Sequence, residues 1–308
     1  LVGHLLEKGF HRVRAVDTKP LDQWHQIHPA AESLRRDVSR AETAQEVTAG
    51  ARYVFNLAAD MGGMGFIEAN KARCMLSVLI NTHLLVAARD RGVERYFYSS
   101  SACVYAASKQ STPDVAPLRE EDAYPAMPED GYGWEKLFGE RMCRHFTEDF
   151  GLATRVARYH NIYGPCGTFE GGREKAPAAI CRKVALAKLR GLDEIEIWGD
   201  GSQTRSFTYI DDCLVGTSLI MEGGFSDPVN LGSNEMVTVD ELVDIVEEIA
   251  GVSLKRVYVP NAPRGVSGRN SDNTLIKSLF GWEPSTSLRE GLECNYRWIY
   301  DQLAAREH

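Results

Sequence analysis

The chain has 308 residues, of which 44% are hydrophobic and 25% are charged, and its formal net charge at pH 7 is -8. This length accommodates one large domain or two ordinary ones, and the composition is that of a soluble globular protein. The acidic balance argues against a nucleic-acid surface, which needs clustered Lys and Arg. It still allows a small anionic ligand held by a few local cations.

Two further features bear on location. No apolar run approaches the ~20 residues that cross a bilayer, and residues 1–6 are too short for a secretory signal and lack a basic leader. The cysteines are scattered, odd in number and free of any Cys-x-x-Cys pattern, which favours a reduced cytoplasm over a disulfide framework or a zinc site. They are Cys74, Cys103, Cys143, Cys166, Cys181, Cys213 and Cys294.

The chain begins with a helix pattern and a strand pattern. Residues 1–9 predict an amphipathic helix that stops at Gly9, and residues 12–17 predict a strand ending in Asp17. In a dinucleotide-binding unit, an acid at the end of the second strand hydrogen-bonds the adenosine ribose. Asp17 is therefore a candidate cofactor ligand.

Such a unit also has a strand and a G-x-x-G-type turn before the helix, and neither precedes Leu1. We expect an N-terminal truncation. A polypeptide that truly lacks the turn should bind NAD poorly, because the turn brings backbone N–H groups to the pyrophosphate. The alternative is a fold that never had the turn, in which Asp17 is an ordinary surface acid.

Strands and helices alternate through the next part of the chain. Strands are predicted at 53–59, 95–98 and 154–159, and a helix at about 71–91 carries apolar residues at helical spacing from Leu76 to Ala88. This order predicts an α/β fold, a Rossmann-like doubly wound parallel sheet covered on both faces. Asp37 either faces the adenine edge or is a solvated loop charge. At the end of the strand predicted at 53–59, Leu57, Ala58 and Ala59 are candidate cofactor contacts, and Tyr132 and Lys136 complete the expected set.

The composition of the sequence changes after Pro165. Residues 167–175 are polar and rich in Gly, and helices are predicted at about 177–189, 240–250 and 288–304, with strands at 194–198 and 256–259. We expect two domains. Residues 1–165 would form the dinucleotide-binding domain, to which the chain returns near 205–230, and residues 166–308 a smaller α/β substrate domain.

Chemically active side chains are densest at residues 98–105, which read Tyr-Ser-Ser-Ser-Ala-Cys-Val-Tyr and leave a buried strand. Ligands of open parallel sheets bind beyond such strand ends. About thirty residues later, Tyr132 and Lys136 are four apart and share one helix face. The order predicts a tyrosine that acts as a base on an alcohol and is oriented by Ser101. A free phenol has a pKa of about 10, so Lys136 and a positive nicotinamide would have to lower it.

Each motif alone has a structural interpretation, namely a serine-rich turn around a buried cysteine and a surface tyrosine beside a solvated lysine. Together, Ser-Ser-x-x-Val-Tyr, Tyr-x-x-x-Lys and Asn-x-Tyr-Gly-Pro resemble the extended short-chain dehydrogenase/reductases that remodel nucleotide sugars. Longer blocks resemble the GDP-mannose 3,5-epimerase group of that family. They include Met-Gly-Gly-Met-Gly, Gly-Gly-Arg-Glu-Lys-Ala-Pro and Gly-Asp-Gly-Ser-Gln-Thr-Arg, and they lie at 55–66, 100–103, 160–165, 171–179, 199–208 and 268–273.

The resemblance implies a mechanism. Tyr132 would take the proton of the sugar 4-hydroxyl while hydride passes from C4 to NAD, and the resulting ketone would acidify the hydrogens on C3 and C5. Cys103 and Lys175 would be the base and acid that invert these centres, since thiols and buried lysines can titrate in a useful range. Return of the hydride would regenerate NAD. GDP-mannose would yield GDP-L-galactose, with GDP-L-gulose as the C5-only product.

The resemblance also implies a homodimer, and a nucleotide-sugar site formed largely by residues of the second domain. Within it, Arg269 is the candidate for the diphosphate, Arg205 binds substrate or ties the domains together, and Gly62 either leaves room for the sugar or is part of a flexible loop. The implied substrate contacts are Gly62, Ser101, Ala102, Cys103, Asn161, Glu174, Lys175, Ala176, Gln203, Thr204, Arg205 and Arg269.

Other interpretations remain open. A nucleotide-sugar 4-epimerase or 4,6-dehydratase would share most of these residues, although a dehydratase needs an acid near Cys103, where the sequence has none. A catalytically inactive NAD-binding relative is the alternative from another class. We interpret His160 as a structural hydrogen-bonding residue, and Cys166 as at most a residue at the edge of the site. No metal site is predicted.

Overall fold

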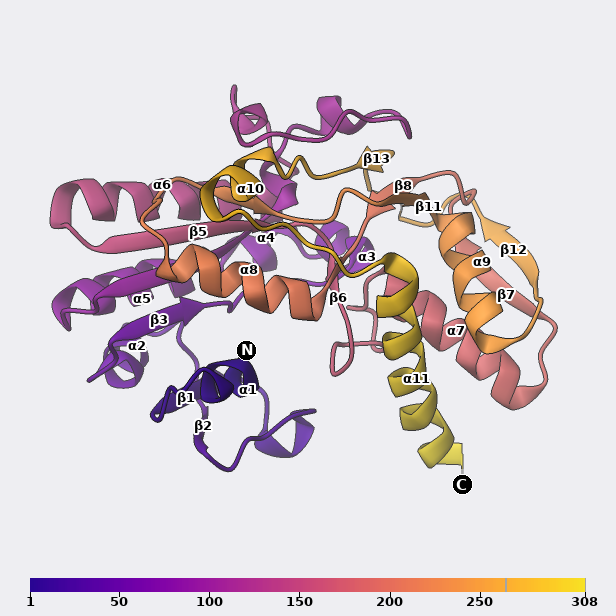
Figure 1. The fold of residues 1–308 in the computed structure, drawn as a ribbon, viewed down its shortest axis with the longest axis horizontal. Helices are drawn as coiled ribbons and strands as arrows, with labels where there is room; N and C mark the ends of the chain where they lie inside the picture. Colours follow the sequence, from indigo (N-terminus) through magenta and orange to yellow (C-terminus); the bar gives the residue numbers. More distant parts are fainter. Residues whose placement is uncertain (264, 308) are drawn as a thin grey trace.

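The computed structural model describes residues 1–263 and 265–307, and a parallel β-sheet lies at its centre (Figure 1). Four strands are hydrogen-bonded in the order β10-β5-β4-β3. Their bounds are β3 (Tyr53–Asn56), β4 (Arg95–Ser101), β5 (Ala153–Tyr159) and β10 (Val229–Leu231). All three pairings are parallel. The predicted doubly wound α/β fold is confirmed, and β10 returns to the sheet from the second half of the chain.

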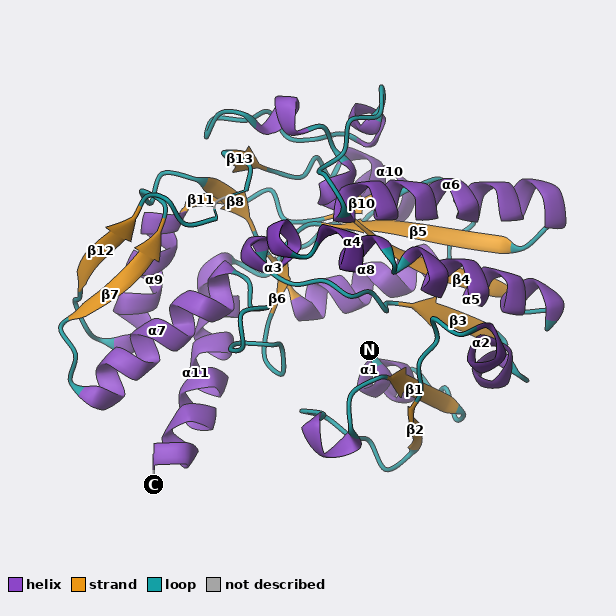
Figure 2. Ribbon diagram, turned by 180° about the vertical axis from the view of Figure 1, so that it is seen from behind, coloured by secondary structure: helices purple, strands orange, loops and turns teal. Residues whose placement is uncertain are grey.

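Successive strand residues point to opposite faces of this sheet, as the period of two requires. Tyr96 and Tyr98 pack against α2 (Ala41–Thr48), α5 (Val78–Asp90) and α6 (Tyr132–Phe150). Phe97 lies on the other face, against α8 (Ile210–Glu222) and α10 (Thr274–Phe280). Figure 2 shows the strands between these helix layers. Burial on both faces extends to polar residues of β5, where Thr154, Arg155 and Arg158 are also buried.

The N-terminal elements form a separate small unit. Helix α1 (Val2–Glu7) precedes β1 (Val13–Asp17), which pairs in parallel with β2 (Ala31–Arg35). The unit lies below β3 in Figure 1, and its contacts with the rest of the chain include a 2.9 Å hydrogen bond between His4 of α1 and Ser218 of α8. A cavity of about 1920 Å³ is lined by every residue of β1 and of β3.

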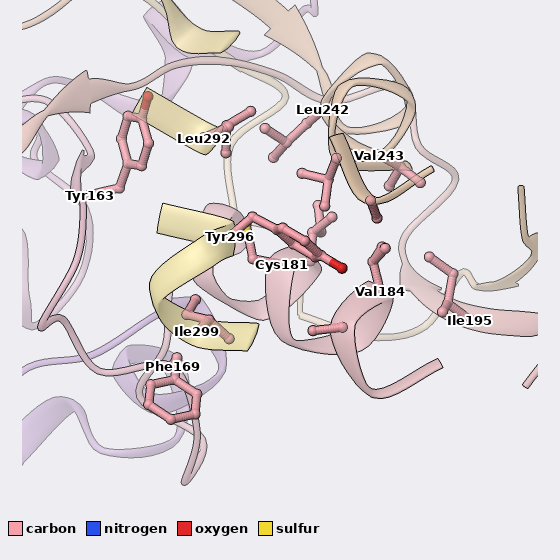
Figure 3. Packing of buried hydrophobic residues seen from close by; sticks show 14 of the residues in the cluster. Tyr163, Phe169, Cys181, Val184, Ile195, Leu242, Val243, Leu292, Tyr296 and Ile299 are labelled. Carbon is pink, nitrogen blue, oxygen red and sulfur yellow. The ribbon is translucent and has the colours of Figure 1, made fainter. Parts of the chain in front are cut away.

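The second half of the chain has its own apolar core (Figure 3). Helices α7 (Ala176–Arg190), α9 (Val239–Ala250) and α11 (Leu288–Glu307) pack around buried residues such as Val184, Leu242 and Leu292. Short strands complete this half: β6 (Ile162–Tyr163), β7 (Glu194–Trp198), β8 (Thr204–Ser206), β9 (Thr208–Tyr209), β11 (Met236–Thr238), β12 (Lys255–Val259) and β13 (Gly268–Arg269). None of the described helices is both long and apolar enough to span a lipid bilayer.

One helix expected from the sequence is interrupted. The predicted helix at 71–91 is instead α4 (Lys71–Met75) followed by α5, after a short helix α3 (Met64–Ala69). The break lies at Ser77, whose hydroxyl accepts a hydrogen bond from the N–H of Asp60. Leu76 and Leu79, which belong to the apolar helical spacing, are 61% and 41% exposed.

Candidate active site

The site begins where β4 ends. Ser101 is its last residue, and its hydroxyl accepts a hydrogen bond from the N–H of Cys103 at 3.2 Å, which starts the 3₁₀ turn Ala102–Val104. Cys103 and Ala102 are buried. Helix α6 starts directly against this turn, because Gly133 lets the two backbones touch: a Cβ there would lie 2.3 Å from the carbonyl oxygen of Cys103. The fold therefore joins the Ser-rich strand end to the Tyr-x-x-x-Lys helix.

Tyr132 and Lys136 lie together in this junction. Tyr132 is buried and hydrogen-bonds Ser101, and the ammonium of Lys136 lies 5.5 Å from the centre of the Tyr132 ring. Burial raises the pKa of Tyr132 well above its ordinary value, and the Ser101 hydrogen bond opposes that rise only in part. Lys136 also pairs with Glu135 at 3.7 Å, and the lowering of the Tyr132 pKa by Lys136 together with a positive nicotinamide stays a prediction.

A buried network of ion pairs and hydrogen bonds lies beside this junction. Glu140 accepts two hydrogen bonds from Arg158, at 2.9 and 2.7 Å, and a third from Ser100 at 2.5 Å. Arg158 also reaches the hydroxyl of Tyr105, which donates to Asn230 at 2.6 Å. The sequence reasoning missed this network. Its one visible signal is that Glu140 follows Lys136 by four residues and so shares its helix face.

Lys175 approaches Cys103 from the other half of the chain. It is the residue before α7, with extended backbone. Burial lowers the pKa of Lys175, while the nearby Cys103 opposes that effect. The same cysteine is near Arg205, whose pKa burial lowers to about 10. The thiol in the turn after β4 and the ammonium just before α7 are thus close enough to interact electrostatically.

Arg269 is also beside Cys103. It is 5% exposed, and its guanidinium donates to the Cys103 sulfur at 3.7 Å and to Gln110 at 2.7 Å. Its remaining nitrogen pairs with the carboxylate of Glu129. The guanidinium that we assigned to the diphosphate is thus engaged with protein groups at the thiol. The sequence showed no acid near Cys103, but the fold brings Glu129 there and neutralises it with Arg269.

The other expected sugar contacts border the same region. Asn161 has a positive φ of 47° and donates to the carbonyl of Ser206 at 2.9 Å. Gln203 is buried, and its side-chain nitrogen has no hydrogen-bond partner among the residues that the structure describes. The hydroxyl of Thr204 bonds to the carbonyl of Pro113. Arg205 donates to the carbonyl of Thr204 at 2.7 Å.

The segments at 60–66 and 171–176 meet at the edge of the site. A Cβ on Gly62 would lie 2.9 Å from the Cβ of Phe66 and 3.1 Å from the Cα of Arg173, so glycine there is needed for packing and the segment is not a loose loop. The carboxylate of Glu174 accepts from the N–H of Gly172 at 2.8 Å and from Arg182 at 3.1 Å. Ala176 is the first residue of α7.

Five of the expected cofactor contacts line the large cavity between β1 and β3, whereas Tyr132 and Lys136 do not. Asp17, Asp37, Leu57, Ala58 and Ala59 all border it. Asp17 accepts from the N–H of Lys19 at 2.9 Å. Hydrogen bonds from Ser39 lower the pKa of Asp37. Acids on one wall and small residues at the carboxyl end of β3 suit a dinucleotide, so the residues present fit NAD.

That cavity reaches Gly62 and Lys175, but Tyr132 and Cys103 are not among its lining residues. A smaller cavity, of about 180 Å³, borders Asp17 and Cys166. His160 is fully buried, its pKa is lowered to about 4 by burial, and its Nε2 pairs with Asn230 at 2.9 Å. This is the geometry of a structural histidine.

A tyrosine–lysine pair and a serine at the carboxyl edge of a doubly wound parallel sheet define an NAD-using enzyme of sugar redox chemistry. The chain belongs to the NAD dependent epimerase/dehydratase family, whose model matches residues 1–232, and NAD is accordingly its cofactor. Among its relatives, GDP-mannose 3,5-epimerase 1 of Oryza sativa subsp. japonica is 50% identical over 87% of this chain and 69% of its own length. GDP-mannose 3,5-epimerase of Arabidopsis thaliana is 48% identical, over 87% of this chain and 70% of its own length.

Solved structures agree on the fold. UDP-glucose 4-epimerase of Thermotoga maritima, with UDP-glucose, is 28% identical, covers 98% of this chain and 94% of its own, and has a TM-score of 0.87. The UDP-glucose 4-epimerase of Thermus thermophilus in complex with NAD is 21% identical, covers 97% of this chain and 94% of its own, and has a TM-score of 0.84.

Proposed function

We propose that this enzyme epimerises GDP-mannose at C3 and C5 through a 4-keto intermediate and releases GDP-L-galactose, with GDP-L-gulose as the C5-only product. One observation carries the proposal. Cys103 is near enough to both Lys175 and Tyr132 to influence their pKa values, in a chain that is 50% identical to a GDP-mannose 3,5-epimerase. Epimerisation next to a ketone requires an acid and a base on opposite faces of the sugar, and Cys103 and Lys175 supply both.

The roles follow from the contacts. Tyr132, hydrogen-bonded to Ser101, takes the proton of the sugar 4-hydroxyl. Cys103 removes a proton from the carbon next to the ketone, and Arg269 at 3.7 Å supports the negative thiolate. Lys175 delivers a proton to the opposite face. Because burial lowers the pKa of Lys175, its ammonium releases that proton more readily than a solvated lysine does.

Asp17, Asp37, Leu57, Ala58 and Ala59 would hold the cofactor in the cavity that they line. When bound, NAD would supply hydride-acceptor chemistry at C4 and would be regenerated when the hydride returns to the sugar. A positive nicotinamide would also oppose the rise in the pKa of Tyr132 that burial causes. The protein's part in the redox step is to orient the sugar and to move the hydroxyl proton.

Deuterium exchange tests the proposal. GDP-mannose is incubated with enzyme and NAD in deuterated water, and substrate and products are followed by NMR. We expect GDP-L-galactose labelled at C3 and C5. A Cys103→Ala variant should still oxidise C4 but lose the exchange at both carbons. Full exchange in that variant would remove Cys103 from the mechanism, and unlabelled product epimerised at C4 would indicate a 4-epimerase.

The rival 4,6-dehydratase needs a carboxyl group that can carry a proton to the sugar. Glu129 is the acid that the fold brings near Cys103, but its carboxylate is paired with Arg269 and only 10% of its side chain is exposed. It is therefore held as a counter-charge. An inactive relative is disfavoured because Ser101, Tyr132 and Cys103 are all present and in contact distance of their partners.

We also propose that the chain divides at about residue 165 into an NAD-binding and a nucleotide-sugar-binding domain, and that the enzyme is a cytoplasmic homodimer. The separate apolar core of α7, α9 and α11 supports the division. All seven cysteines are free, which suits a reducing compartment. An apolar face of α4, α5 and α6 supports the dimer: Met75, Leu76, Leu79, Trp134 and Phe138 are each more than 40% exposed.

Light scattering after size exclusion tests the dimer. We expect Phe138→Glu to shift the protein to monomer, because the new carboxylate would be buried without a partner in an apolar interface. Leu192→Glu is the control, since Leu192 is also exposed, at 53%, but lies elsewhere on the chain. A wild-type monomer, or a Phe138→Glu dimer, would remove this face as the interface.

A further inference from the structure

Two segments meet at Lys175, and the proposed reaction assigns no role to the contact between them. The segment 60–66 follows β3 in the first half of the chain, and the segment 171–175 precedes α7 in the second half. The N–H of Gly63 donates to the carbonyl of Arg173 at 3.0 Å. A Cβ on Gly63 would lie 2.4 Å from the carbonyl oxygen of Glu174. The backbones are therefore in direct contact two residues from Lys175.

The side chain of Arg173 also holds the two segments together. Its guanidinium donates to the carboxylate of Asp60 at 2.7 Å and to the carbonyl of Met61 at 3.0 Å. Its Cζ also lies 3.8 Å from the centre of the Phe66 ring. One side chain thus bonds to the loop at two points and stacks on a third. Arginine's planar, rigid donor set makes such a combination possible, and lysine cannot reproduce it.

Asp60 is held from the other side as well. Arg73 pairs with its second oxygen, and the N–H of Asp60 is fixed to Ser77 at 2.9 Å. Burial raises the pKa of Asp60, but the hydrogen bonds from Arg173 and Arg73 outweigh burial and leave this pKa below its ordinary value. The carboxylate is therefore ionised near neutral pH and offers Arg173 a fixed anchor.

We propose that the Asp60–Arg173 ion pair is a positioning device that holds the 171–175 segment on the 60–66 loop and so sets the ammonium of Lys175 opposite Cys103. The inference rests on the proposed function, in which Lys175 is the acid. Asp60 and Arg173 are positioning residues, because they act through the backbone that carries Lys175. The pair links the half of the chain that holds the thiol to the half that holds the ammonium.

The positioning role can be tested because Cys103 and Lys175 act on opposite faces of the sugar. In deuterated water, Cys103 takes a proton from carbon and its thiol exchanges that proton for a deuteron. If the thiol gives the deuteron back, the substrate is recovered labelled with its configuration retained. If Lys175 delivers a deuteron from the opposite face, the centre is inverted and the amine regains a deuteron from solvent. The ratio of retained label to inverted label therefore reports how well Lys175 is placed.

The comparison uses Arg173→Gln against a matched control, Arg73→Gln. Both variants remove one arginine that pairs with Asp60 and lies over the Phe66 ring, but only Arg173 also bonds the carbonyl of Met61 and belongs to the Lys175 segment. We expect Arg173→Gln to raise the ratio about tenfold or more, since misplacing a reacting group by ~1 Å costs about a hundredfold. Arg73→Gln should stay within about twofold of wild type, and Arg173→Lys should fall between them.

A second measurement does not need turnover. Lys175 is acetylated in the free enzyme over a range of pH, and the modified site is quantified by mass spectrometry. We expect faster acetylation in Arg173→Gln, because the released segment exposes the amine to solvent, and no change in Arg73→Gln. Equal ratios and equal acetylation in both variants would overturn the positioning role. A wild-type enzyme that neither labels nor converts GDP-mannose would instead overturn the proposed function, and acetylation would then decide the placement of Lys175 alone.

Discussion

The contact between Gly133 and Cys103 can be perturbed by a single methyl group. In Gly133→Ala the new Cβ would lie 2.3 Å from the carbonyl oxygen and 3.2 Å from the carbonyl carbon of Cys103. Opening the shorter contact to the 3.0 Å that real Cβ atoms require moves α6 and the Cys103 turn apart by about 0.7 Å. Since backbone atoms form the contact, no side-chain rotation relieves it.

Two free-energy effects oppose each other in this variant. Alanine favours a helix over glycine by about 1 kcal/mol, whereas overpacking a tight contact costs about 1–3 kcal/mol. The clash therefore wins, with a net stability loss of at most ~2 kcal/mol. The effect on rate is larger. A shift of 0.7 Å between Tyr132 and Cys103 should lower kcat by between about ten- and a hundredfold, because a misplacement of ~1 Å costs about a hundredfold.

The assay is conversion of GDP-mannose followed by NMR, together with a urea denaturation curve of each protein. Gly224→Ala is the control, since a Cβ on Gly224 meets nothing within 4 Å. We expect it to match wild type in both measurements. A kcat of Gly133→Ala within about twofold of wild type would refute the reasoning, because it would mean that the strand end and the helix start are not held in register by this contact.

Three further outcomes are expected from charged groups. Glu140→Gln should lower the free energy of unfolding in urea by about 3–5 kcal/mol, because Arg158 would keep a buried charge without its partner; a loss no larger than that of the exposed Glu148→Gln would contradict this. Burial lowers the pKa of Lys175, so the wild-type rate of epimerisation should fall with rising pH at values below the ordinary lysine pKa. If a Lys175→Arg variant shows the same fall in rate, another group causes it. His160 has a pKa of about 4 when folded and about 6.5 when unfolded, so stability should fall as pH drops between these values, and His160→Gln should flatten that slope in urea titrations at each pH.

The fold was largely predictable because its signals are local. The aromatic run at 96–98 favours a strand covered by helices on each side, and the Tyr132–Lys136 spacing places both on one helix face. The break at Ser77 was not predictable. It depends on the backbone of Asp60, which is 17 residues away in sequence, and it leaves Leu76 on the surface although the period is helical.

The candidate site was predictable as a set of residues but not as a set of contacts. Motif order brought Ser101, Tyr132 and Cys103 together correctly. The pairing of Arg269 with Glu129 joins residues 140 positions apart, and no spacing rule reaches that far. Arg173 is similar: its sequence neighbours indicate a loop residue, while the fold pairs its guanidinium with the carboxylate of Asp60. Long-range ion pairs follow from topology, so sequence patterns do not reveal them.

The cavity between β1 and β3 has walls that are stabilised separately. In the part of the chain that the structure describes, β1 pairs only with β2, and its small unit is tied to the remainder by surface contacts such as Arg14 to the carbonyl of Val47 and Lys8 to Glu222. Asp17 is on one wall and Ala58 on the other. A dinucleotide that bridges the two walls acts as a cross-link. Binding of the cofactor and docking of the N-terminal unit on the rest of the chain are therefore thermodynamically coupled. The cofactor concentration then sets how firmly the first strands are attached, as mass action requires.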